Sequence, residues 1–124
     1  MQYEIKYNSE FHFIEVTSFG EFTINDYKVQ IEEAIRFGKT KNTFLFFVNN
    51  TQLKNSASIT DIYNIPKLYR FYVGENQLKL AALFSIDSQN KEAISFYENI
   101  CVNNGLNVKT FFDREEALQW LLSK

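Results

Sequence analysis

The sequence is poor in residues that cross-link or interrupt a chain. Of its 124 residues, one is cysteine, one is proline and four are glycine. The single cysteine, Cys101, cannot form a disulfide within the chain, which is typical of proteins in a reducing cytoplasm. Few prolines and glycines, with a hydrophobic content of 45%, exclude a disordered chain. We therefore expect one cytoplasmic domain over residues 1–124.

Excess positive charge and long apolar runs are also missing. The formal net charge is −2, whereas nucleic-acid-binding domains are basic because they neutralise phosphates. No apolar run approaches the roughly 20 residues of a membrane-spanning helix. The first ten residues alternate in polarity and carry Glu4, unlike a signal peptide. The sequence thus predicts no nucleic-acid partner and no membrane insertion.

Hydrophobic periodicity predicts nine elements. Residues 3–7 alternate and residues 11–16 form a second strand, which favours an antiparallel hairpin. Further strands are expected over 43–48, 78–86 and 107–112, the first two apolar enough to be covered on both faces. Helical spacing fills the gaps between these strands and the end of the chain. The order β-β-α-β-α-β-α-β-α predicts an α/β layered fold with a mixed, mostly parallel five-stranded sheet and four helices.

Local signals indicate where the helices begin and end. Thr23 has the position of a cap for the first helix, and Asp113 that of a cap for the last. Gly38 is expected to end the first helix. Pro66 leaves two alternatives for the second helix: it kinks at Pro66, or it begins near Asn64 with Pro66 in its first turn.

The element order resembles that of STAS domains, which have the anti-sigma-factor antagonist fold. The likeness is carried by "LKLAALFSID" (78–87) and by "FYENICVNNGLNVKTFFDREEALQWL" (96–121). A helix, a short loop at Asn104–Gly105, a strand ending in "FFD" and then "EEALQWL" is similar to the SpoIIAA-like branch, sometimes grouped as STAS/SEC14-like. Weaker agreement covers the rest of the chain. The resemblance implies a regulatory or binding module rather than an enzyme.

The resemblance also indicates a candidate switch. Regulatory STAS domains are phosphorylated on a serine at the start of the helix after the third strand, and that region here holds Ser56 and Ser58. The family's Asp-Ser-Ser-Gly-type motif is absent, since this sequence has "NSASITD" (55–61). A phosphate at either serine would be favoured by a helix N-terminus.

A polar stretch, 49–60, follows the apolar third strand. The carboxyl ends of parallel strands are where ligands collect in α/β sheets, so Asn49 and Asn50 with Ser56 and Ser58 form a candidate partner or ligand surface. The alternative is a solvated connection in which a hydroxyl merely caps the next helix.

Aromatic residues are in excess, at 17% of the chain. The segment 62–72, "IYNIPKLYRFY", holds more than one buried stripe can accommodate, which places Tyr63 and Phe71 at its edge or outside. Exposed aromatic groups favour a protein-partner surface, including self-association, or a groove for a small apolar ligand. The alternative is that the stems of Lys67 and Arg70 half-cover these rings.

Catalytic chemistry has little support in the sequence. His12 is the only histidine and is expected within a strand, while Cys101 falls on the apolar stripe of its helix and is expected in the core. Asp87 either caps the next helix or lines the strand-end edge. We expect no catalytic set, no metal site and no cofactor. The first hypothesis is a non-enzymatic, STAS-like protein-binding module; the second is an apolar-ligand domain with a pocket under the 59–73 helix.

Overall fold

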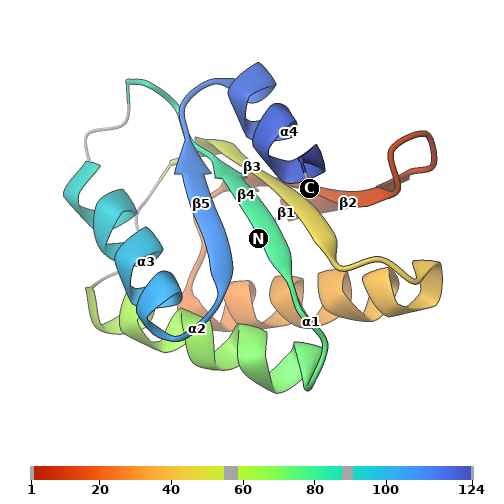
Figure 1. Ribbon diagram of the computed structural model, residues 1–124. Coiled ribbons are helices and arrows are strands. Elements are labelled where there is room, and N and C mark those ends of the chain that lie inside the picture. Colours follow the sequence, from red (N-terminus) through yellow and green to blue (C-terminus); the bar gives the residue numbers. More distant parts are fainter. Residues whose placement is uncertain (1, 55–58, 88–90, 124) are drawn as a thin grey trace.

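The computed structural model describes residues 2–54, 59–87 and 91–123 (Figure 1). Its elements follow one another in the order that the sequence predicts. They are β1 (Gln2–Asn8), β2 (Phe13–Gly20), α1 (Ile24–Lys41), β3 (Leu45–Leu53), α2 (Ile59–Val73), β4 (Lys79–Leu83), α3 (Lys91–Asn103), β5 (Asn107–Phe111) and α4 (Arg114–Leu122).

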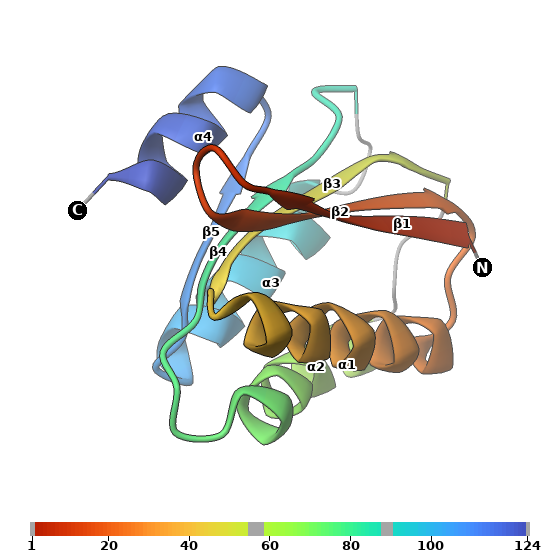
Figure 2. The same cartoon turned by 90° about the vertical axis from the view of Figure 1, so that its right-hand side faces the viewer.

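The strands lie side by side in sequence order. In the described part of the chain, β1 pairs antiparallel with β2, and β2, β3, β4 and β5 pair parallel in one five-stranded sheet. Helices α1, α2 and α3 cover one face of this sheet, and α4 lies on the other (Figures 1 and 2). The predicted α/β fold with a mixed, mostly parallel sheet is confirmed.

The two faces of the sheet carry separate cores. Phe46 of β3 packs toward α1, α2 and α3, whereas its neighbour Phe47 packs toward Ala117 and Leu121 of α4. Both phenylalanines are almost completely buried. A strand covered on both faces has no polar side to display, which explains why this segment is apolar without alternation.

The predicted caps of the first and last helices are present. The Thr23 hydroxyl accepts from the Asp26 N–H at 3.2 Å, and the Asp26 carboxylate accepts from the Thr23 N–H at 2.8 Å. At α4, the Asp113 carboxylate accepts from the Glu116 N–H at 2.9 Å. Each bond satisfies an N–H group that the helix itself cannot pair.

The prediction that Gly38 ends α1 is wrong. The helix continues to Lys41, and Asn42 ends it in the left-handed conformation with φ of 57°. Gly38 lies inside α1, and a Cβ there would sit 2.7 Å from the Thr43 carbonyl oxygen and 3.0 Å from the Phe46 ring. Glycine is therefore needed for close packing of α1 against the start of β3, and asparagine supplies the stop because it tolerates positive φ.

The second helix passes through Pro66. Helix α2 begins at Ile59, so the alternative in which it starts near Asn64 is wrong. Pro66 lacks the N–H that would bond to the Ile62 carbonyl. Its ring is fully buried, and that packing offsets the missing hydrogen bond.

Candidate functional site

The outward face of α2 carries an exposed aromatic stripe. Tyr63, Lys67 and Phe71 follow one another at a spacing of four residues, so they share one side of the helix. The Tyr63 side chain is 53% exposed and that of Phe71 is 78% exposed. The Lys67 ammonium lies 5.6 Å from the centroid of the Tyr63 ring. We call these three residues the outer stripe of α2; the prediction that Tyr63 and Phe71 lie outside the core is confirmed.

The inward face of α2 is locked into the larger core. Its residues Ile62, Ile65, Tyr69 and Val73 are all buried. The Tyr69 hydroxyl lies 2.8 Å from the buried Tyr97 hydroxyl of α3, within hydrogen-bonding distance. The outer stripe therefore stands on a helix whose position is fixed by other residues.

The basic side chains near the stripe leave Phe71 uncovered. Arg70 turns away from it and donates from Nη1 to the Asn104 carbonyl at 2.8 Å, at the end of α3. On the other flank, Phe71 meets the Tyr72 ring edge-on, with centroids 5.0 Å apart. The Tyr72 hydroxyl in turn donates to a Glu32 carboxylate oxygen at 3.4 Å. The stems of the basic residues thus do not shield the most exposed ring.

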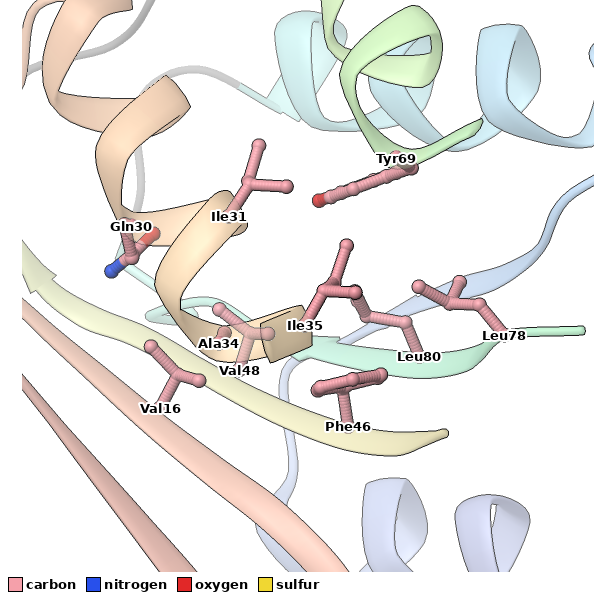
Figure 3. Close-up of a pocket in the computed structure, with 10 residues that line it drawn as sticks. All are labelled: Val16, Gln30, Ile31, Ala34, Ile35, Phe46, Val48, Tyr69, Leu78 and Leu80. Carbon is pink, nitrogen blue, oxygen red and sulfur yellow. The ribbon is translucent and has the colours of Figure 1, made fainter. Parts of the chain in front are cut away.

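Among the described residues, a small cavity lies beneath α2. It encloses about 30 Å³ between the sheet, α1 and α2 (Figure 3). That is room for one or two water molecules, whereas pockets for small ligands measure about 300–1,000 Å³. Its lining is Val16, Gln30, Ile31, Ala34, Ile35, Phe46, Val48, Tyr69, Leu78 and Leu80. The Tyr69 ring points across the cavity toward Ile31 of α1 (Figure 3).

Asn49 and Asn50 belong to a strand rather than to a loop. β3 continues to Leu53, five residues beyond the predicted end, so the polar stretch is shorter than the sequence indicates. The cause is pairing: β2 also runs further than predicted, to Gly20, and β3 follows it. A tertiary ladder thus holds polar residues in extended conformation against their local preference.

A β-bulge interrupts this ladder at the two asparagines. Thr17 pairs with Asn49, but the next pair joins Phe19 to Gln52, so β3 carries one extra residue. The Asn49 side-chain oxygen accepts from the Thr51 N–H at 3.0 Å and from the Thr51 hydroxyl at 2.7 Å. The Asn49 amide therefore has a local structural role.

The predicted site residues that the structure describes do not form one surface. Asn49 is two residues beyond Phe47 in β3, so both lie on the face of the sheet that α4 covers. Helix α2 packs on the opposite face. Ser56 and Ser58 lie outside the described residues. Asp87 is exposed at the strand-end edge. The structure thus places Tyr63 and Phe71 together and keeps them apart from Asn49.

His12 and Cys101 are far apart in the fold. His12 lies in the β1–β2 loop with φ of 61°, not in a strand; its Nδ1 is 2.6 Å from the Tyr7 hydroxyl and its Nε2 is 3.0 Å from the Asn42 carbonyl. Cys101 is fully buried on α3, as predicted. Burial, aided by the Glu98 charge, raises the pKa of Cys101 to about 12. At neutral pH the thiol is protonated and unreactive.

Within residues 2–54, 59–87 and 91–123, no three histidine, cysteine, aspartate or glutamate side chains come together in a way that could hold a metal ion. No helix in the same ranges has the length and apolar character needed to cross a membrane.

One contact, at the β5 edge of the sheet, could not be predicted from the sequence. The Glu98 carboxylate of α3 accepts from the Thr110 N–H at 2.6 Å and from the Thr110 hydroxyl at 2.9 Å. Because β5 pairs only with β4, this N–H belongs to the free edge of the sheet. Only the folded arrangement brings Glu98 to it, since the two residues are twelve positions apart.

Two solved structures share this arrangement over nearly the whole chain. One is an uncharacterized protein of the DUF3478 family from Shewanella loihica PV-4, described as having a SpoIIAA-like fold; it covers 97% of this chain and 92% of its own, with a TM-score of 0.58 and 18% identity.

The fold is SpoIIAA-like. The second structure is the anti-sigma factor antagonist SpoIIAA in its unphosphorylated form, with a TM-score of 0.52, 12% identity and coverage of 99% of this chain and 100% of that one. No protein-family model and no curated protein matches the sequence. At these identities the likeness is one of fold, and function has to be argued from the site.

Proposed function

We propose that this chain is a non-enzymatic, STAS-like regulatory module that acts by binding another protein through the outer stripe of α2. The observation that carries the proposal is the 78% exposure of Phe71 on a helix whose opposite face is buried in the core. Burying a phenylalanine side chain is worth about 1.5–3 kcal/mol. A solvent-facing phenylalanine that the core does not use is therefore available to a partner.

The chemistry of the outer stripe suits a protein partner. Tyrosine and phenylalanine are enriched at protein interfaces, and tyrosine is common among the few interface residues that dominate binding energy. The stripe lies on a packed helix, so little conformational entropy is lost when a partner orders it. One solved protein of this fold is an anti-sigma factor antagonist, a role named for its effect on another protein.

A domain for a small apolar ligand has less support. The cavity under α2 encloses about 30 Å³, roughly a tenth of the smallest volume typical of ligand pockets. A ligand would have to displace packed side chains such as Tyr69 and Ile31, which line the cavity from α2 and α1 (Figure 3).

The proposal is tested by comparing what variants retain when purified from the native host. The variants are Phe71→Ser and Tyr63→Ser, and the matched control is Phe11→Ser, which removes a ring that is 51% exposed in the β1–β2 loop. We expect the same protein to copurify with the unmodified chain and the control, and to be lost from both α2 variants.

Folding is monitored in parallel. All three substitutions replace exposed side chains, so each should change the free energy of unfolding by no more than about 0.5 kcal/mol. Loss of a partner from a variant that keeps its unfolding midpoint supports the proposal. Equal retention by all four chains, or no specific protein with any of them, overturns it.

A further inference from the structure

The outer edge of β1 is an unpaired strand edge. Among the described strands, β1 is the first of the sheet and pairs with β2 alone. Figure 2 shows it at the front of the molecule, with α1 below it and no described helix across its outer side. The opposite edge differs, because Glu98 occupies a backbone donor of β5. Free strand edges are ready sites for pairing with another chain.

The sequence of β1 is self-complementary. It reads Gln-Tyr-Glu-Ile-Lys-Tyr-Asn over Gln2–Asn8 and is symmetric about Ile5. Glu4 and Lys6 stand one step from Ile5 and carry opposite charges. Tyr3 and Tyr7 stand two steps away, and amide side chains stand three steps away. Two such strands laid antiparallel about a two-fold axis at Ile5 place every residue opposite a matching one.

We propose that β1 pairs antiparallel with β1 of a second copy of this chain, joining two five-stranded sheets into one continuous sheet. The contact is isologous, so the same strand contributes both halves of the interface. It lies at the sheet edge and not on the outer stripe of α2, which leaves the stripe available to another partner.

On the open face of the sheet, the pairing joins opposite charges twice. Glu4 and Lys6 are two residues apart, so both project from that face, and both are exposed. With the axis at Ile5, Glu4 of one copy lies opposite Lys6 of the second copy, and the reverse holds on the other side of the axis. Directly opposed charges of unlike sign stabilise a strand pair, and like charges destabilise it.

On the helix-covered face, the same register aligns a second set of opposite charges. The Tyr3 hydroxyl donates to Glu33 of α1, and the Lys41 ammonium lies 5.3 Å from the centroid of the Tyr7 ring. The pairing sets Tyr3 of one copy against Tyr7 of the second copy. It therefore brings Glu33 of one copy toward Lys41 of the second copy at both ends of the strand pair.

The charges also select the register. A shift by two residues in one direction would set Glu4 against Glu4, and a shift in the other direction would set Lys6 against Lys6. Both are like-charge pairs and are disfavoured. One strand pair with a helix flank is a small interface, so we expect a dissociation constant on the order of micromolar to tens of micromolar.

Sedimentation velocity over about 5 to 500 μM tests this interface through its charges. The unmodified chain should form dimers as its concentration rises. Glu4→Lys, whose neighbour on β2 is the uncharged Thr17, should weaken the dimer at least about tenfold, because it sets lysines opposite each other twice. Combining Glu4→Lys with Lys6→Glu should restore the dimer.

Mixing the two single variants gives the sharpest outcome. A chain with Glu4→Lys and a chain with Lys6→Glu should each dimerise poorly alone but form a heterodimer together, provided both melt as folded proteins. Phe71→Ser should leave the dimer unchanged. A chain that stays monomeric throughout, or a dimer unaffected by Glu4→Lys, overturns the proposal. A dimer lost in Phe71→Ser also overturns it and places self-association on α2 instead.

Discussion

Tyr69 and Tyr97 join α2 to α3 through hydroxyl groups 2.8 Å apart in the buried core. Loss of solvation is the main cause that raises the pKa of both phenols, and it keeps both neutral. Each hydroxyl is the hydrogen-bond partner of the other in this buried layer. This contact fixes the helix whose opposite side carries Tyr63 and Phe71.

Removing one of these hydroxyls should lower the free energy of unfolding more than removing both. Tyr69→Phe or Tyr97→Phe leaves the remaining hydroxyl unpaired in the core, at a cost of about 1–3 kcal/mol in the free energy of unfolding. The double variant has no orphaned group and should be no less stable than the worse single variant. Urea unfolding of the four proteins measures this coupling. Additive losses would show that the two hydroxyls do not depend on each other.

Alkaline pH should destabilise the fold, beginning with Cys101. Burial raises its pKa from the ordinary value of 9.0 for a thiol to about 12. Its stabilising contribution is therefore complete below about pH 9, where the unfolded thiol is also protonated, and is lost as pH rises toward 12. The linked loss between pH 8 and pH 10 is about 1 kcal/mol. The raised pKa values of Tyr69 and Tyr97 add to the loss above about pH 10, where a solvated phenol begins to ionise.

Melting temperatures of the unmodified chain and of Cys101→Ala, measured from pH 7 to pH 10, distinguish the contribution of the thiol to this pH dependence from that of the tyrosines. The variant should be less stable at pH 7, because it loses a buried side chain. Its melting temperature should nevertheless fall less between pH 8 and pH 10. Parallel curves for the two proteins would contradict the assignment.

Gly38→Ala should destabilise the protein although alanine favours helices. The added methyl group would meet the Thr43 carbonyl oxygen at 2.7 Å, and backbone cannot move aside as a flexible side chain can. Overpacking of this kind costs about 1–3 kcal/mol. The control is Lys39→Ala, at an exposed position of the same helix, which should be nearly neutral. The midpoints of urea unfolding measure the difference in stability. A Gly38→Ala variant more stable than the unmodified chain would mean that α1 and β3 are not in close contact there.

The architecture is predictable because the pattern of burial along each element is visible in its own residues. Residues alternate in polarity in β1, which has one covered face, and are continuously apolar around Phe46 and Phe47, where both faces are covered. The role of Gly38 is not predictable from the sequence, because a helix stop and a close approach both favour glycine and only the position of Thr43 distinguishes them. Asn49 was assigned to a loop because its place in β3 comes from pairing with β2, which local preference does not record.

The candidate site was predictable only in part, for the same reason. Tyr63 and Phe71 were placed outside because a helix has one buried stripe, and this one had too many aromatic residues. The separation of Asn49 from α2 depends on which face of the sheet each occupies. The face that each residue occupies is determined by the packing of α4 on one side of the sheet and of α1, α2 and α3 on the other.

Phosphorylation of Ser56 or Ser58 stays a prediction from the resemblance to STAS domains. Phosphopeptide mass spectrometry of the chain isolated from its native host should find a modified serine in the tryptic peptide that contains residues 55–61. Ser56→Ala and Ser58→Ala identify which one is used, and a phosphate there should change the amount of copurifying protein. A peptide found only in unmodified form under all growth conditions would contradict the switch.

Phe71 is the central residue of the proposed partner surface, and photo-crosslinking from that position tests its role most directly. Benzoylphenylalanine replaces Phe71 in one chain and Phe11, in the β1–β2 loop, in another, and both are irradiated in the native host. Position 71 should give one defined adduct with a second protein, and position 11 should give none. Equal, diffuse labelling from both positions, or no adduct from position 71, would contradict the assignment of α2 as the partner surface.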